Sequence, residues 1–299
     1  MKNCTMNRFD STNSNVRKYV FTWEDAVAET VLYRYGDFME RTVICCSVMS
    51  GCPVGCTFCG TGNKFIRNLT TGEIVGQIKD VLNDAMIYEK MDHCKKFQIM
   101  FMSMGEPFLN YDNVEEAIRI LHKMFPNAQL LISTIAPNVK DSYAYGKFIK
   151  LSKEIEKVGL QFSIHRSFDS ERNELIPYKN KYTLREIRDY GIMWCMETGR
   201  KLYLNYCIDG NNNTVHDYYE LIKLFSPVVF CFTFSVVCSS DETMKDAGYR
   251  NLDAIRDFEA KFMEDGYDTR VFDPAGQDDI GGGCGQLWYV QQWMKGMRT

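Results

Sequence analysis

The sequence predicts an α/β fold in which six parallel strands form a partial (β/α)6 TIM-type barrel, preceded by a short N-terminal β extension. Strand-like and helix-like segments alternate from residue 42 to residue 272, at a spacing typical of parallel strands joined by helical crossovers. Six such units fit an open barrel better than a doubly wound sheet, although periodicity alone does not separate these two arrangements. After a first strand that leads into a cysteine-rich loop, the expected strands lie at residues 97–102, 129–134, 160–165, 201–208 and 228–236.

Helices are expected between these strands. The clearest one begins at Thr70-Thr71-Gly72-Glu73, where a threonine precedes an apolar run and a carboxylate lies in the first turn, which is a capping signal. Its apolar residues then recur at helical spacing, at Ile74, Val75, Ile78, Val81 and Leu82. The expected helices lie near residues 71–91, 114–124, 143–158, 184–197, 215–225 and 252–266.

The chain is expected to form a single catalytic domain over residues 18–299. Residues 1–17 are polar and have no apolar period, so a flexible lead-in is expected there. The domain then divides into the β extension at 18–41, the barrel at 42–272, and a C-terminal loop and tail at 273–299.

The composition is that of an ordinary globular protein, with 299 residues of which 45% are hydrophobic. No window approaches eighteen uninterrupted apolar residues, and the N-terminus lacks the apolar core of a signal peptide, so a cytoplasmic protein without a membrane partner is expected. In that compartment the twelve cysteines are better explained as reduced thiols and metal ligands than as disulfides. The net charge of -4 argues against a globally basic nucleic-acid binder.

Three cysteines in one short loop, Cys52, Cys56 and Cys59, indicate a site for a soft metal. Zinc or a fully protein-ligated iron-sulfur cluster would normally have a fourth protein ligand nearby, yet no cysteine or histidine follows within thirty residues. A cluster held at three corners instead leaves one iron open to a small chelating ligand. The alternatives are a zinc knuckle and a disulfide loop.

Polar residues end several of the expected strands, where ligands of parallel α/β sheets bind. The second strand ends in Gly105 and Glu106, the third in Ser133, and the fourth in Ser163 and His165. A lone histidine is often a core residue, so His165 is open to either interpretation. These five residues are the expected ligand contacts at the barrel mouth.

The cysteine loop, with Phe58 directly before its third cysteine, resembles the radical S-adenosylmethionine (radical SAM) superfamily. Within it the chain is most similar to the RlmN/Cfr family of radical SAM RNA-adenine methylases, from about Lys18 to Gln286. The spacing and order of several segments support this resemblance: Thr42-Val43-Ile44-Cys45, residues 67–77, residues 104–110, Ser163-Ile164-His165, residues 169–177, Asp278-Asp279-Ile280 and Cys284-Gly285-Gln286-Leu287.

The resemblance implies two cofactors. The three loop cysteines would hold a 4Fe-4S cluster whose open iron binds S-adenosylmethionine, and two molecules of S-adenosylmethionine would be used per turnover. Glu106, beside Gly105, would accept a charge-assisted hydrogen bond from its amino group. Ser133, Ser163 and His165 would contact its carboxylate, ribose and adenine.

The resemblance also assigns catalytic roles to Cys45 and Cys284, which lie far apart in the sequence. Cys284 would carry a methyl group, and a radical formed on that group would add to the adenine ring. Cys45 would remove the ring proton and attack the sulfur of Cys284, releasing the methylated base and leaving a disulfide. Gly281, Gly282 and Gly283 suit a mobile loop that carries Cys284, although they also suit an ordinary turn.

The chain departs from the family pattern in three places. Only about seventeen residues precede the matching region, where the family has a helical domain of RNA-binding character. An Asn-x-x-Pro-Trp-Asn segment that helps hold S-adenosylmethionine is absent, and Thr233 or Ser235 would be imperfect substitutes. The C-terminal tail, residues 287–299, is aromatic and only mildly basic, where the family pattern has a strongly basic tail.

The expected activity is methylation of an adenine carbon in RNA, either tRNA or rRNA, at carbon 2 in preference to carbon 8. A flavodoxin or ferredoxin would supply electrons. The alternative is the same two-cysteine chemistry on a nucleotide or another substrate that is not rRNA, which the acidic balance favours. A metal-binding or RNA-binding protein without turnover is a third possibility, against which the pair Cys45 and Cys284 weighs.

Overall fold

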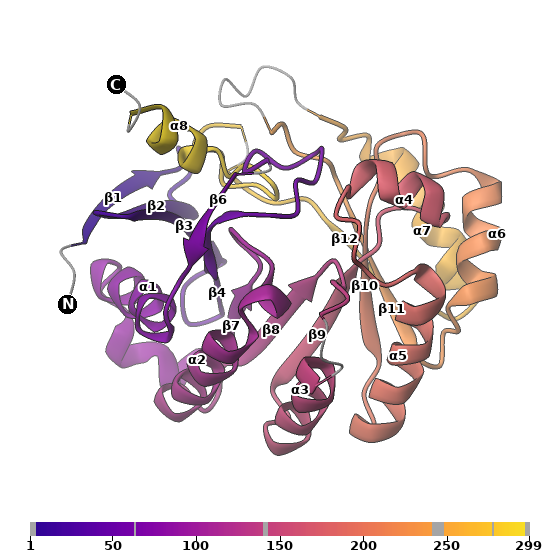
Figure 1. Cartoon of the computed structure of the whole chain (residues 1–299), viewed down its shortest axis with the longest axis horizontal. Helices are drawn as coiled ribbons and strands as arrows, with labels where there is room; N and C mark the ends of the chain where they lie inside the picture. Colours follow the sequence, from indigo (N-terminus) through magenta and orange to yellow (C-terminus); the bar gives the residue numbers. More distant parts are fainter. Residues whose placement is uncertain (1–3, 63, 140–142, 241–247, 277, 297–299) are drawn as a thin grey trace.

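The structure, a computed structural model, describes residues 4–62, 64–139, 143–240, 248–276 and 278–296. Figure 1 shows a curved sheet that encloses the chain segments of the site, with helices along its outer side. In spatial order the ten strands of this sheet are β1 (Thr5–Asp10), β2 (Val16–Trp23), β3 (Ala26–Tyr35), β4 (Arg41–Cys45), β7 (Lys96–Phe101), β8 (Gln129–Thr134), β9 (Val158–Ser163), β10 (Leu202–Cys207), β11 (Phe230–Ser235) and β12 (Thr269–Phe272), and β5 (Met49–Cys52) and β6 (Lys64–Asn68) form a separate antiparallel pair.

The strands from β4 to β12 are parallel to their neighbours, which confirms the predicted parallel α/β architecture. The structure adds a seventh parallel strand, β12, which pairs with β11. The sequence did not indicate β12 because it is four residues long and none of its side chains is buried. Its position matters for the site, because Phe272 at its end lines the pocket described below.

The N-terminal extension is an antiparallel continuation of the same sheet, formed by β1, β2 and β3. Residues 5–10 were expected in a flexible lead-in, but they form β1 and pair with β2 in continuous register from Thr5 opposite Thr22 to Asp10 opposite Arg17. Backbone hydrogen bonds of an antiparallel ladder hold this strand, so the sequence needs no apolar period there.

The six expected helices are all present, and each starts within three residues of its expected first residue. Thr70 and Glu73 form a capping box at the start of α1, which ends at Asp84 because Met86 takes a left-handed backbone conformation. The helices are α1 (Thr71–Asp84), α2 (Tyr111–Met124), α3 (Tyr143–Glu154), α4 (Asp169–Leu175), α5 (Leu184–Thr198), α6 (Val215–Leu224), α7 (Leu252–Glu264) and α8 (Tyr289–Gly296), with 3-10 turns at Tyr88–His93 and Pro107–Asn110.

The barrel strands separate an apolar outer layer from a more polar interior. In β8 the residues alternate, so that Leu130 and Ile132 are buried under the helices while Leu131 and Ser133 are only partly buried on the other face. Because these strands are parallel, their carboxyl ends, with the polar residues that follow them, lie at one rim of the barrel. No helix among the described residues has the length and apolar character needed to cross a membrane.

Candidate active site

The three loop cysteines lie together at this rim. Cys52 ends β5 (Met49–Cys52), and Cys56 and Cys59 lie in the loop before β6 (Lys64–Asn68). All three thiols are free and partly buried. Burial raises the pKa of Cys52 to about 12, and the charge of Cys59 contributes to this shift, which indicates that the two sulfurs are near each other. Cys56 likewise has a raised pKa from burial and from the charges of the other two cysteines.

The chemistry of this loop suits an iron-sulfur cluster. The loop holds three free thiols and no fourth cysteine or histidine. A structural zinc site normally has four protein ligands. Three thiolates can instead bind three irons of a 4Fe-4S cluster and leave the fourth iron open to a small ligand.

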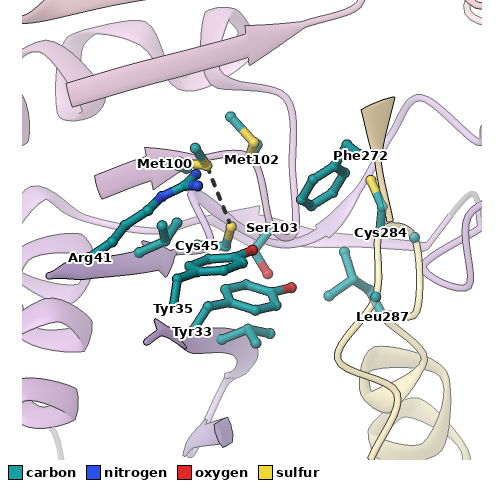
Figure 2. Close-up of a pocket in the computed structure, with 14 residues that line it drawn as sticks. Tyr33, Tyr35, Arg41, Cys45, Met100, Met102, Ser103, Phe272, Cys284 and Leu287 are labelled. Carbon is teal, nitrogen blue, oxygen red and sulfur yellow. Dashed lines mark hydrogen bonds between the residues drawn. The ribbon is translucent and has the colours of Figure 1, made fainter. Parts of the chain in front are cut away.

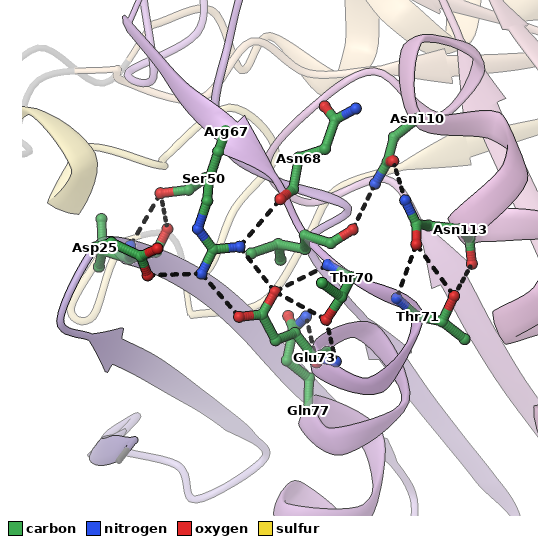
Figure 3. A network of polar contacts seen from close by, with 12 residues as sticks. Asp25, Ser50, Arg67, Asn68, Thr70, Thr71, Glu73, Gln77, Asn110 and Asn113 are labelled. Carbon is green, nitrogen blue, oxygen red and sulfur yellow. Dashed lines mark hydrogen bonds and ion pairs between the residues drawn. The ribbon is translucent and has the colours of Figure 1, made fainter. Parts of the chain in front are cut away.

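A network of polar contacts joins β6, which follows the cysteine loop, to the start of α1 (Figure 3). Arg67, at the end of β6, donates two hydrogen bonds to Glu73, at 2.8 and 2.7 Å, and a third to Asp25 at 2.9 Å. Glu73 also accepts from the backbone of Thr70 in the capping box. Because bidentate arginine–carboxylate pairs fix orientation, this network holds β6 and the start of α1 against the β2–β3 turn.

Glu106 is a buried carboxylate at the end of the second barrel strand. It accepts hydrogen bonds from Thr134 Oγ1 at 2.6 Å and from the backbone N–H groups of Ile135 and Phe108 at 2.9 and 3.0 Å. Burial raises its pKa to about 7, and these three hydrogen bonds oppose that shift. None of the described salt bridges includes Glu106, so its charge suits a cationic ligand such as the ammonium of S-adenosylmethionine.

Ser133, Ser163 and His165 lie at the ends of neighbouring strands. The hydroxyl oxygens of Ser133 and Ser163 are 3.3 Å apart, so the structure brings this predicted pair together. His165 is buried, and its Nδ1 accepts a hydrogen bond from the backbone of Cys207 at 3.0 Å. Its ring packs edge-on against Phe58 of the cysteine loop, with the ring centres 5.1 Å apart.

The chemistry of His165 follows from this burial. Loss of water and the charges of Arg172 and Arg166 lower its pKa to about 3, so the ring is neutral at physiological pH. With Nδ1 as acceptor, the proton is on Nε2. His165 is thus a neutral hydrogen-bond donor that packs against the cysteine loop.

The two residues suggested as substitutes on strand β11 lie in different surroundings. Ser235 donates a hydrogen bond to Oδ1 of Asn205 at 2.7 Å, at the rim. Thr233 accepts one from Arg270 at 2.7 Å, deeper in the barrel. Ser235 with Asn205 is therefore the better candidate for a ligand contact. Sequence analysis missed Asn205, although an asparagine near the end of a strand is the signal that could have identified it.

Cys45 and Cys284, from opposite ends of the chain, line one pocket (Figure 2). The pocket has a volume of about 70 Å³ and opens between β4 and the C-terminal segment. The sulfur of Cys45 lies 4.0 Å from the sulfur of Met100. Exclusion of water raises the pKa of Cys45 to about 12, to which the charge of Cys284 contributes, and it raises the pKa of Cys284 to about 11. Both thiols are thus protonated at rest.

The loop that carries Cys284 is anchored on both of its sides. Lys18, buried in β2, donates to the carbonyl oxygens of Gly281 and Gln286 at 3.0 and 2.8 Å. It also forms an ion pair with buried Glu29 at 2.6 Å, and its ammonium lies 4.4 Å from the ring centre of Trp288. The expected mobility of the glycine loop is therefore restricted to the few residues around Cys284. Lys18 could not be identified from the sequence as part of the site, because the two carbonyl groups that it binds in this loop are more than 260 residues away.

Comparison with known proteins identifies close relatives of this chain. The sequence pattern of the radical SAM superfamily matches residues 46–223. The chain is 32% identical over 278 residues to a probable dual-specificity RNA methyltransferase RlmN of Thermotoga neapolitana, covering 89% of this chain and 74% of that protein. It is 29% identical over 305 residues to the corresponding protein of Finegoldia magna, covering 100% and 82%.

A similar solved structure agrees with this result. The crystal structure of a radical SAM methyltransferase from Sphaerobacter thermophilus superimposes with a TM-score of 0.80 and 28% identity, covering 95% of this chain and 81% of that one. The Streptococcus suis protein SuiB bound to S-adenosylmethionine shares the fold, with a TM-score of 0.53 and 12% identity.

Proposed function

Because the chain belongs to the RlmN family of the radical SAM superfamily, we propose that it methylates an adenine carbon in RNA. Family membership makes it a radical SAM methyltransferase that uses a 4Fe-4S cluster and S-adenosylmethionine. The names of the relatives support RNA as the substrate. Carbon 2 is the proposed position because that activity is the commoner one in the family that the sequence resembles.

The observation that carries the proposal is the shared pocket of Cys45 and Cys284. Two thiols that merely filled core positions would have no reason to meet, since one ends β4 and the other lies in a C-terminal loop. One of them, Cys284, is exposed, and Cys45 is partly buried, so a substrate can reach both. The arrangement supports two separate roles, one thiol that carries the methyl group and a second thiol that releases the product.

We assign the methyl carrier to Cys284 and the release step to Cys45. The Cys284 thiolate takes the methyl of one S-adenosylmethionine, which gives a thioether. Held by Cys52, Cys56 and Cys59, the cluster with a second S-adenosylmethionine would supply abstraction of a hydrogen atom from that S-methyl group and would accept the one electron that the ring adduct later loses. The S–CH2 carbon of Cys284 would bond to the adenine carbon, which joins the protein to its substrate. Cys45 then removes the ring proton and attacks the sulfur of Cys284, so that the sulfur–carbon bond breaks and its electron pair goes to the carbon. The carbon takes up a proton as a methyl group, and a Cys45–Cys284 disulfide remains.

The surrounding residues would hold the cofactors. Cys52, Cys56 and Cys59 would bind the cluster, and Glu106 would bind the ammonium of S-adenosylmethionine. The remaining contacts are proposed for Gly105, Ser133, Ser163, His165 and Ser235. A flavodoxin or ferredoxin is the proposed electron donor, because each turnover needs low-potential electrons and a reductant for the disulfide.

The proposal is tested by incubating anaerobically reconstituted protein with S-adenosylmethionine, a reductant, and separately tRNA, rRNA and adenosine monophosphate. Digestion and mass spectrometry of the nucleosides would then identify the product. We expect methylated adenosine, substituted at carbon 2, in one of the RNA samples. Methylation of the free nucleotide alone would support the alternative substrate, which the net charge of -4 favours.

A further inference from the structure

Arg41 is a second polar feature of the cysteine pocket, and the chemistry above does not use it. It begins β4 and lines the pocket together with Cys45 and Cys284. Its Nε donates a hydrogen bond to the side-chain oxygen of Gln98 at 3.1 Å, and its guanidinium lies 4.4 Å from the ring centre of Tyr35. Figure 2 shows the side chain reaching along the pocket wall toward Met100.

Two neighbouring side chains, Gln98 and Tyr35, fix the position of this guanidinium. Gln98 is buried, and its amide nitrogen donates to the side-chain oxygen of Gln129 at 2.8 Å, so its own oxygen is directed at Arg41. The hydrogen bond and the ring of Tyr35 therefore hold Nε and one face of the guanidinium. The two terminal nitrogens have no hydrogen-bond partner within the described part of the chain, which leaves their donors for a ligand.

Two further cations lie near Arg41. Lys96 begins the neighbouring strand β7 in register with Arg41, and Arg270 lies on β12. Desolvation lowers the pKa of Lys96, and the charges of Arg41 and Arg270 lower it further. The described salt bridges include none of these three cations. Arg41 thus lies near two other cations, and none of the three forms a salt bridge with a carboxylate in the described part of the chain.

The remaining lining of the pocket suits a flat base. Tyr33, Val43, Phe272 and Leu287 offer aromatic and aliphatic surface beside the two thiols. Aromatic side chains stack on nucleobases, and arginine binds phosphate through two parallel N–H groups. The Cα atoms of Arg41 and Cys45 are four residues of strand apart, about 13 Å. The guanidinium and the two thiols thus line different parts of the same pocket.

We propose that Arg41 binds a phosphate group of the nucleotide whose base lies between Cys45 and Cys284. This inference rests on the proposed function, since it takes the pocket to be the substrate site. The phosphate belongs either to an RNA backbone or to a free mononucleotide, and the chemistry of recognition is the same. Arg41 would thereby set which part of the substrate enters the pocket.

The test compares ligands that differ only in phosphate charge. Equilibrium dialysis would measure the binding of adenosine, adenosine 5'-monophosphate, a short oligoadenylate and its uncharged methylphosphonate analogue to the wild type, Arg41→Gln and Arg185→Gln. Arg185 is an exposed cation on α5 and serves as the control. We expect at least one charged ligand to bind the wild type and Arg185→Gln about tenfold more tightly than its uncharged analogue, as one charge-assisted contact provides.

In Arg41→Gln this preference should fall to about onefold, while the binding of the uncharged ligands stays unchanged. A preference for the monophosphate identifies a free nucleotide, and a preference only within the oligonucleotides identifies an RNA backbone. The proposal is overturned if Arg41→Gln keeps the full preference for the charged ligand. It is also overturned if the wild type prefers neither the monophosphate over adenosine nor the oligoadenylate over its methylphosphonate analogue. Arg41→Lys, which retains a cation, should keep part of the preference and shows that the effect is not a loss of folding.

This experiment separates the phosphate site from the reaction. Loss of the preference in Arg41→Gln, together with an absence of methylated product in the wild type, would count against the methyl transfer and not against the phosphate site. Unchanged methylation of RNA by Arg41→Gln, at substrate concentrations below saturation, would count against the phosphate site alone.

Discussion

The ammonium of Lys18 lies 2.6 Å from the carboxylate of Glu29, and both side chains are fully buried. The same ammonium donates to backbone oxygens on either side of Cys284. A charge pair inside the protein therefore ties the N-terminal extension to the loop that carries the proposed methyl carrier. The extension, which has no counterpart in a simple barrel, thus contributes to the site.

Lys18→Met should destabilise the protein strongly, because it leaves Glu29 buried without its counterion. The expected loss in the free energy of unfolding is about 3–5 kcal/mol, as for other broken buried pairs. Chemical denaturation followed by circular dichroism measures it. The double variant Lys18→Met/Glu29→Gln should recover part of the loss, since no charge then remains buried. A single variant as stable as the wild type would show that the pair does not hold the loop.

Cys56→Ala should abolish cluster binding. The wild type, reconstituted anaerobically, is expected to hold about four irons with matching sulfide, because three thiolates and a small ligand complete the shell. Cys195→Ala removes a partly buried thiol outside the loop and is the matched control. Iron analysis and the visible absorption spectrum provide the measurement. Stoichiometric zinc in place of iron, or a normal cluster in Cys56→Ala, would contradict the assignment.

Binding of S-adenosylmethionine should strengthen as the pH rises through about 7. Burial holds the pKa of free Glu106 at about 7, and an ammonium partner would lower it, so binding below that pH requires release of a proton. Above pH 8 the carboxylate is already ionised, so the contribution of Glu106 to the pH dependence should vanish. Calorimetry of the reconstituted protein at pH 6.5, in buffers of different ionisation enthalpy, measures the proton released.

Glu106→Gln provides the comparison for that experiment. It should weaken binding about tenfold or more at pH 8 and remove the proton release, because an amide cannot form the charge-assisted bond. Asp112→Asn, a change of a highly exposed carboxylate, should leave both quantities unaltered. Wild-type affinity in Glu106→Gln would remove Glu106 from the cofactor site.

Methylation of Cys284 should accelerate with pH. Although Cys284 has exposed surface, the protein atoms packed around its sulfur displace enough water to raise its pKa to about 11, so at pH 8 only about one molecule in a thousand carries the reactive thiolate. Between pH 7 and pH 9 the rate should rise about tenfold per unit while the thiolate step is limiting. Intact-mass measurement of the S-methyl increment over time, at saturating S-adenosylmethionine, follows it. A flat profile would mean that another group activates the sulfur.

The sequence was sufficient where a residue's role depends on its neighbours in the chain. The spacing of Cys52 and Cys56 and the position of Glu106 after a strand end marked them as candidate ligand residues, and the alternation of elements correctly predicted the parallel sheet. The sequence was insufficient where the role depends on distant partners. In the sequence Lys18 looks like an exposed strand residue, but the C-terminal segment covers it in the structure. Arg41 is oriented by Gln98 and Tyr35, and neither contact can be predicted from the sequence.

Two structural elements were missed for related reasons. β1 has five exposed residues out of six, so no apolar pattern marks it, and only its backbone pairing defines it. β12 is held by the edge of β11 and is too short to show a period. The meeting of Cys45 and Cys284 was expected from the family resemblance, but no spacing in the sequence could have supplied it.

Cys284 is proposed to carry the methyl group and Cys45 to release the product. The variant Cys45→Ala separates these two roles, because it removes only the second. In this variant the carrier can still be methylated and joined to adenine, but no thiol resolves the link. Cys284→Ala, the matched control, has no place for the methyl group and should form no adduct.

The measurement is intact-mass spectrometry and denaturing electrophoresis of each variant after incubation with RNA, S-adenosylmethionine and reductant. We expect Cys45→Ala to accumulate a covalent protein–RNA species, which migrates more slowly on the gel and whose mobility returns close to that of the free protein after nuclease treatment. Cys284→Ala should form no such species. Full turnover by Cys45→Ala, or an adduct that forms in Cys284→Ala, would contradict the assignment of the two cysteines.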